Sequence, residues 1–169
     1  MDRKEVTNFL SELLIQQRFS GRGKYWAKEV TLDYGQGQGK VKRVDFMQFK
    51  PFNQLAVSGL EKGEFICYEI KSCKADVFSG HGLNFEGERN YIVTTMETWK
   101  ELISNGQERI PHCVGIMVAC YKDKYKEFEN PTPLSKDGCW RLEVVRQAHP
   151  IDRKRSIAEL LFCMLRSGR

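Results

Sequence analysis

The sequence lacks the cysteine and histidine patterns of disulfide frameworks and zinc sites. Its six cysteines form no Cys-x-x-Cys pair, and several lie inside apolar runs, as reduced thiols in a protein core do. The three histidines show no two-histidine metal spacing. These absences argue against a disulfide-stabilised secreted scaffold and against a zinc-binding module, and they predict a reduced, cytoplasmic environment.

Long apolar runs and linkers are missing as well. No stretch of about 18 consecutive apolar residues occurs, so the sequence predicts no membrane span and no membrane partner. No Pro/Gly/Ser-rich stretch divides the chain, and its 169 residues, 41% of them hydrophobic, suffice for one sizeable core. We therefore expect a single domain over residues 1–169.

The chain has no strong excess of charge of either sign. Its 27 Lys and Arg residues against 22 Asp and Glu residues give a net charge of +5. Such a balance is compatible with binding a polyanion but is common in unrelated proteins. Function has to be inferred from the placement of individual charged residues.

Apolar periodicity predicts alternating helices and strands. Helices are expected over about 3–18, over 97–104 and after Asp152, and strands over 26–34, 41–49, 64–72, 91–94, 114–121 and 140–146. The first two strands should form a hairpin around the glycine-rich segment 35–39, and residues 91–121 should form a βαβ unit. This order predicts an α/β domain with a central mixed sheet flanked by helices.

Two charges interrupt the buried strand expected at residues 65–71. Glu69 and Lys71 are two residues apart, so in an extended chain they share one face. The apolar residues Ile66, Tyr68 and Ile70 share the opposite face. A carboxylate beside an ammonium group is suited to binding a metal ion and a phosphate.

The preceding strand carries a lone acid in the same manner. Asp45 lies within the apolar run 41–49, and strict alternation predicts that Val44 and Phe46 share the opposite face. If the strands containing Asp45 and Glu69 are neighbours, their carboxyl groups converge. The sequence therefore predicts an acid pair at one place in the sheet.

Two acids on adjacent strands can hold Mg²⁺, which prefers oxygen ligands and keeps several water molecules. A nearby lysine would orient or deprotonate the attacking water and stabilise charge on a phosphate. Asp45, Glu69 and Lys71 are thus the candidate catalytic residues for phosphodiester hydrolysis. The alternative is a surface salt bridge, because acid-any-Lys also occurs at 2–4 and 152–154.

The motifs Arg43-Val44-Asp45-Phe46 and Tyr68-Glu69-Ile70-Lys71-Ser72, with the order of elements over about residues 3–121, resemble the PD-(D/E)XK nuclease superfamily, in particular its small DNA-repair and resolvase-like members. The resemblance implies a restriction-endonuclease-like core and a Mg²⁺-dependent endonuclease that cuts DNA, with Mn²⁺ as a substitute ion. It implies that Asp45, Glu69 and the Ile70 carbonyl bind the metal and that Lys71 is the catalytic lysine. No proline precedes Asp45, which departs from the family signature.

Members of this superfamily often carry a further acid on the first helix. Glu5 or Glu12 could fill this role, and Glu5 is slightly preferred; its alternative role is to stabilise the first helical turn. Lys42, Arg43 and Lys74 are candidates for contacts with nucleic-acid phosphates.

Two other functions are consistent with the same fold. A catalytically inactive relative would bind nucleic acid or another protein without cutting, and an RNA-processing nuclease, the less favoured reading, would apply the same chemistry to RNA. The apolar face of the last helix, which includes Leu160 and Met164, either completes the core or forms a homodimer contact.

Overall fold

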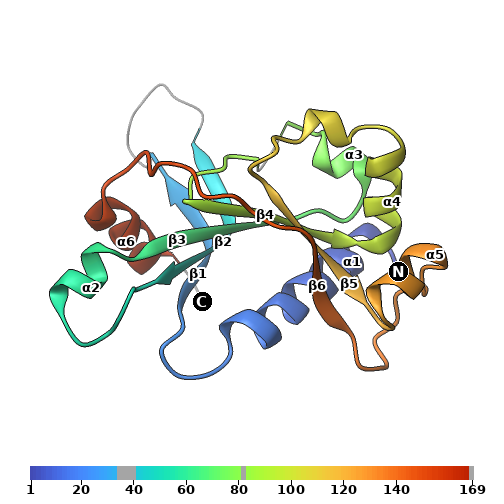
Figure 1. The fold of residues 1–169 in the computed structure, drawn as a ribbon, viewed down its shortest axis with the longest axis horizontal. Helices are drawn as coiled ribbons and strands as arrows, with labels where there is room; N and C mark the ends of the chain where they lie inside the picture. Colours follow the sequence, from blue (N-terminus) through green and yellow to red (C-terminus); the bar gives the residue numbers. More distant parts are fainter. Residues whose placement is uncertain (34–40, 81–82, 168–169) are drawn as a thin grey trace.

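Six strands form one mixed sheet whose spatial order follows the order along the chain (Figure 1). The strands are β1 (Tyr25–Leu32), β2 (Lys42–Lys50), β3 (Glu64–Ile70), β4 (Arg89–Thr95), β5 (Gly115–Cys120) and β6 (Arg141–Arg146). β3, β4 and β5 are parallel, and the pairs β1–β2, β2–β3 and β5–β6 are antiparallel. The structure is a computed structural model that describes residues 1–33, 41–80 and 83–167. It confirms the predicted α/β class with a central mixed sheet.

Helices cover both faces of this sheet (Figure 1). They are α1 (Arg3–Leu14), which continues as a π-helix over Ile15–Phe19, then α2 (Val57–Glu61), α3 (Lys74–Val77), α4 (Met96–Ser104), a 3₁₀ helix over Gln107–Arg109, α5 (Lys124–Glu129) and α6 (Ile157–Arg166). α1 packs on one face, while α4 and α6 cover the two ends of the other. In the described part of the chain, no helix is both long and apolar enough to cross a membrane.

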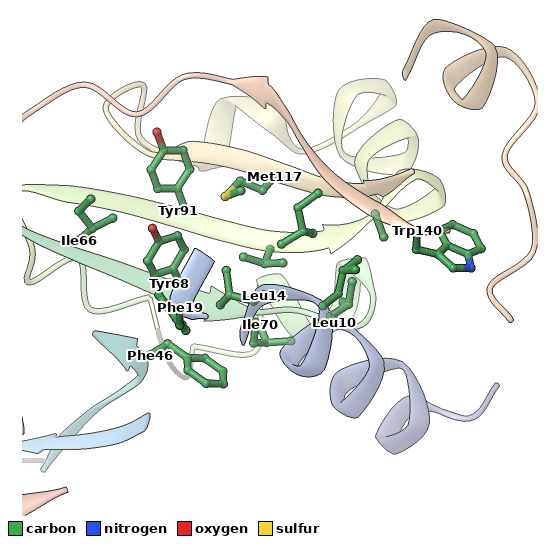
Figure 2. Close-up of a cluster of buried hydrophobic side chains, with 14 of the residues drawn as sticks. Leu10, Leu14, Phe19, Phe46, Ile66, Tyr68, Ile70, Tyr91, Met117 and Trp140 are labelled. Atoms are coloured by element: carbon green, nitrogen blue, oxygen red, sulfur yellow. The ribbon is translucent and has the colours of Figure 1, made fainter. Parts of the chain in front are cut away.

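The core under α1 explains why the strands alternate as they do. Leu10 and Leu14 of α1 belong to the same buried cluster as the strand residues Tyr68 and Tyr91, whose rings stack with centroids 5.7 Å apart (Figure 2). Because side chains of a strand alternate between faces, Ile92 of β4 points the other way, into the core under α4. Each fully buried side chain of this size contributes about 1.5–3 kcal/mol.

Several predicted elements are confirmed and one boundary is wrong. β4, α4 and β5 form the expected parallel βαβ unit, whereas the predicted hairpin turn at 35–39 lies outside the described residues. The last helix begins at Ile157 instead of after Asp152, and the Ser156 side chain caps it by accepting the Glu159 N–H. The residues before it are held in an extended path because the Ile151 N–H donates to the Glu88 carbonyl.

Candidate metal centre and catalytic site

The candidate site lies where strands β2 and β3 separate. Their backbone pairing runs from Lys50 opposite Glu64 to Phe46 opposite Tyr68 and stops there. At the next step the Asp45 carboxylate accepts the Ile70 N–H at 2.8 Å, so a side chain replaces the backbone partner. The separation of the strands thus opens a space at the position where both strands carry their acids.

The two predicted acids meet in this space. Glu69 is only 2% exposed, and its carboxyl group contacts that of Asp45. Two ionised carboxylates have no proton to share, and neither Glu69 oxygen has a hydrogen-bond donor within the described residues. A buried polar group left without a partner costs about 1–3 kcal/mol, and a charged one costs more. Within the described part of the chain, no cation therefore bonds directly to the Glu69 oxygens.

The electrostatics of the pair agree with this reading. Burial raises the pKa of Glu69 far above its usual range, and the neighbouring Asp45 charge raises it further. Burial also raises the pKa of Asp45, against the Ile70 N–H and the Lys71 ammonium, which lower it. Without a bound cation, the pair retains a proton. A divalent cation would replace that proton, so these residues fit a metal ion with oxygen ligands.

Lys71 is fixed beside the acids by strand β4. Its side chain is buried, at 4% exposure, and its backbone N–H donates to the Val93 carbonyl at 2.9 Å. The hydroxyl of the fully buried Thr94 donates to the Lys71 carbonyl at 2.6 Å. The Lys71 charge opposes the rise in pKa of both Asp45 and Glu69, which places the ammonium near the carboxyl pair. The predicted grouping of these three side chains is confirmed.

A groove of about 1090 Å³ opens above the site. Asp45, Ile70 and Lys71 line it, and Glu69 lies beneath them. One wall is the polar face of α1, and the other is formed by β1 and β2. The side chains along these walls are mostly polar: Arg3, Thr7, Asn8, Ser11, Lys28, Glu29, Thr31, Lys42 and Arg43. The groove is open to a polar ligand and is not filled by apolar groups.

Two of the three predicted phosphate-binding residues reach this groove. Lys42 and Arg43 line it, and each is held by a carboxylate: Lys42 by Glu86 at 2.7 Å and Arg43 by Glu29 at 2.8 Å. Lys74 is half-buried on α3 and is not among the described residues that line the groove. Its predicted phosphate contact does not fit this placement.

The auxiliary role predicted for Glu5 does not fit the structure either. Glu5 forms a capping box with Asp2, in which each side chain accepts the other residue's N–H at 2.8 Å. Glu5 and Glu12 both line a separate groove on α1 that also includes Trp140. The alternative role, stabilisation of the first helical turn, explains Glu5 because its carboxylate satisfies a free N–H at the helix start.

Two further acids line the groove, Asp76 and Glu29. Asp76 accepts the N–H and the hydroxyl of Ser72 and forms an ion pair with Arg3 at 2.6 Å, so it ties α1 to the segment after Lys71. The sequence predicts Asp76 at the rim of the site, as a helix N-cap, but the N-cap position of α3 is Cys73. The sequence analysis did not identify Glu29, because an exposed glutamate on a strand has no pattern that separates it from other surface acids. Its backbone has φ +54°, a left-handed conformation that costs a non-glycine residue about 1–2 kcal/mol.

Across the described residues, no group of three or more histidine, cysteine, aspartate or glutamate side chains gathers as a metal cluster. The side-chain ligands available are therefore two carboxylates. In an extended strand, the N–H and C=O of one residue leave on the same side. Because the Ile70 N–H points to Asp45, the Ile70 carbonyl adds an oxygen on that side.

No protein-family model matches the chain, and no curated protein matches it. A solved structure of the SPO1766 protein of unknown function from Silicibacter pomeroyi is similar, with a TM-score of 0.52 and 16% sequence identity. The match covers 98% of this chain and 86% of that chain. At this level of identity, the likeness concerns the fold alone.

Proposed function

We propose that this chain is a metal-dependent endonuclease of the PD-(D/E)XK kind, with a restriction-endonuclease-like core, that hydrolyses phosphodiester bonds in DNA. The observation that carries the proposal is the buried Glu69 carboxyl group, which lies against Asp45 and has no donor within the described residues. Such an arrangement destabilises a fold unless a cation fills it. A surface salt bridge, the alternative considered for this motif, would be exposed and paired.

Asp45, Glu69 and the Ile70 carbonyl would hold Mg²⁺, or Mn²⁺ in its place. Mg²⁺ usually keeps several water molecules and is held by one or two carboxylates together with substrate phosphate oxygens, so a site with two acids is sufficient. When bound, the ion supplies Lewis-acid stabilisation of the phosphate and lowers the pKa of a water molecule.

The chain's own residues supply the remaining functions. The Ile70 N–H fixes one Asp45 oxygen at 2.8 Å, which orients the carboxylate before any ligand binds. We expect the Lys71 ammonium, a compact donor on a segment held by β4, to orient the attacking water and to offset negative charge on the phosphate. Burial of Glu69 and Lys71 keeps the local dielectric low and strengthens both effects.

DNA is the proposed substrate because the groove wall formed by β1 and β2 carries Lys28, Lys42 and Arg43, and such cations contact a phosphate backbone without regard to sequence.

Dimer formation stays a prediction. α6 buries Leu160, Cys163 and Met164, while Phe162 and Leu165 on its outer side are exposed.

The test is a cleavage assay on supercoiled, linear, single-stranded and branched DNA in Mg²⁺ or Mn²⁺. The wild type should cut at least one of these, and Lys71→Ala should lower the rate by about a thousandfold. Lys74→Ala is the matched control, since this lysine is three residues away and lies outside the groove; it should cut at the wild-type rate. Binding without cleavage would favour the inactive module instead, and an RNA panel would detect an RNA-processing enzyme.

A further inference from the structure

The β1–β2 ladder has one irregular step, and it is opposite the catalytic acid. The pairing passes from Lys28 opposite Phe46 to Val30 opposite Val44, so that Glu29 and Asp45 face each other between them. Glu29 has φ +54° at this step. Left-handed backbone at a residue other than glycine, asparagine or aspartate is uncommon, and it persists only where the surroundings enforce it.

Both strands change the face they present at this step. Ala27 and Val30 of β1 point into the same core under α6, although they are three positions apart and would face opposite ways in a regular strand. Val44 and Met47 of β2 do the same. The expectation that Val44 and Phe46 share a face is therefore wrong, because the irregular step lies between them.

The face change decides what lines the groove. With regular alternation from Met47 and Phe49, Asp45 would point toward α6. Because of the irregular step, Arg43, Asp45 and Phe46 all line the groove on the α1 side. The strained residue and the catalytic acid thus belong to one local feature.

The Glu29 carboxylate binds the Arg43 guanidinium through its Nε atom. Its Oε2 lies 2.8 Å from the Arg43 Nε, and both side chains are more than half exposed. Exposed ion pairs contribute little to stability, so this pair does not account for the strained backbone. Contact through Nε leaves the two Nη groups of Arg43 for a bidentate contact with phosphate oxygens.

Arg43 is also close to the acid pair. Its charge lowers the pKa of both Asp45 and Glu69 against the effect of burial. Arg43 is two residues before Asp45 and lines the same groove, so its guanidinium can contact a phosphate that is bound at the acid pair. Glu29 cannot make that contact itself, because its carboxylate repels a phosphate.

We propose that Glu29 is a positioning residue that holds the Arg43 guanidinium at the groove wall, with its Nη groups presented to the phosphodiester being cut. The proposal rests on the proposed nuclease function and adds a residue to it. It predicts two opposite effects of removing the Glu29 charge. The affinity for DNA rises, because a negative charge leaves the groove and Arg43 is released; the turnover falls, because Arg43 is no longer held in place.

The experiment measures DNA affinity in EDTA by fluorescence anisotropy and kcat and KM in Mg²⁺ for Glu29→Gln. We expect about threefold tighter binding without metal and a kcat about tenfold lower. The matched control is Glu143→Gln, which breaks another Arg Nε to Glu pair, that of the exposed Arg141 with the half-buried Glu143 at 3.0 Å on β6. It should change neither quantity.

Two further variants separate positioning from folding. Glu29→Gly accepts a positive φ without strain, so it should be at least as stable as the wild type and still lose turnover. In an Arg43→Ala background, Glu29→Gln should have no further effect on kcat, because the residue to be positioned is gone.

The outcomes are distinguishable from those of the proposed function. If the wild type cuts DNA and Glu29→Gln matches Glu143→Gln, Glu29 positions nothing and the cleavage assignment is untouched. A loss of kcat that persists in the Arg43→Ala background would also overturn the proposal. If the wild type binds DNA but does not cut it, the DNA affinity of Glu29→Gln in EDTA is the remaining test. An affinity equal to that of the wild type would overturn the proposal. A wild type that neither binds nor cuts removes both proposals.

Discussion

Two buried acids of this protein, Glu69 and Glu86, are both 2% exposed and have opposite surroundings. Each Glu86 oxygen has a cation: Lys42 lies 2.7 Å from one and Arg155 lies 3.1 Å from the other. Arg155 also binds both oxygens of Asp33, at 2.8 and 2.9 Å. Glu69 has another carboxyl group as its neighbour and no donor within the described residues.

The pKa values follow the surroundings in opposite directions. Burial tends to raise the pKa of Glu86, but hydrogen bonds from Lys42 and Arg155 overcome it and the pKa falls below the usual value. Burial raises the pKa of Glu69, and no cation overcomes it. Glu86, whose oxygens are both paired, connects Arg155 in the segment before α6 to Lys42 of β2. Glu69, whose oxygens have no hydrogen-bond partner in the described residues, is instead a candidate ligand-binding group.

The comparison predicts its largest effect in catalysis. Glu69→Gln should reduce the rate of DNA cleavage by about a thousandfold because it removes a metal ligand. Glu86→Gln should leave kcat within about twofold, provided that the protein is folded, because its side chain is outside the reacting centre. Rates measured per folded molecule check this; equal losses in the two variants would contradict it.

Stability should change in the opposite direction. In EDTA at neutral pH, Glu86→Gln should lower the free energy of unfolding by about 2–4 kcal/mol, because it weakens the pairing of the largely buried Arg155 and of Lys42. Glu69→Gln should raise that free energy by about 1–3 kcal/mol, because it removes the cost of keeping a buried carboxyl group protonated at neutral pH. Urea unfolding of the two variants gives both values. Destabilisation by Glu69→Gln would mean that Glu69 is an ordinary structural residue.

The pH dependence of stability sharpens the same contrast. The folded-state pKa of Glu69 is raised above 4.5, so the folded state binds more protons than the unfolded chain, and the stability of the metal-free protein falls as the pH rises above that value. For Glu86 the folded-state pKa is lowered, so its contribution is present at neutral pH and is lost on acidification. From about pH 5 to about pH 8, the advantage of Glu69→Gln over the wild type should grow. A constant difference would contradict the pKa assignment.

The smallest effect concerns the salt dependence of DNA binding. Arg43→Ala should reduce the slope of log affinity against log salt by about 1, since one phosphate contact is lost. Arg153→Ala, which removes a cation paired with Glu88 at 2.8 Å outside the groove, should leave the slope unchanged. Anisotropy titrations at several salt concentrations measure both.

The regular parts of the fold and of the site were predictable from local patterns. β3 alternates without interruption, so strand periodicity predicts Glu69 and Lys71 on one face and Ile66, Tyr68 and Ile70 on the other, and the structure buries these three in the core under α1. The register of β2 and β3 brings Asp45 opposite Glu69, as neighbouring strands predict, but the face that Asp45 presents depends on the irregular step opposite Glu29. Strand periodicity is a sufficient guide only where the backbone is regular, as it is in β3.

The remaining features depend on contacts between distant residues. The left-handed backbone of Glu29 has no sequence signal, because no glycine or asparagine marks it. The rotation of α1 about its axis decides that Glu5 faces away from the acids, and helical periodicity alone does not specify that rotation. The late start of α6 reflects ion pairs of Arg153 and Arg155 with Glu88 and Glu86, about 65 or more residues away.

Calorimetric titration with Mn²⁺ tests most directly whether Asp45 and Glu69 form a metal site. The wild type and Glu86→Gln should bind the ion with release of a proton, seen as a binding heat that depends on the buffer's ionisation enthalpy. Glu69→Gln should bind at least tenfold more weakly. A wild type that binds no ion, or a Glu69→Gln variant that binds as tightly as the wild type, would contradict the account.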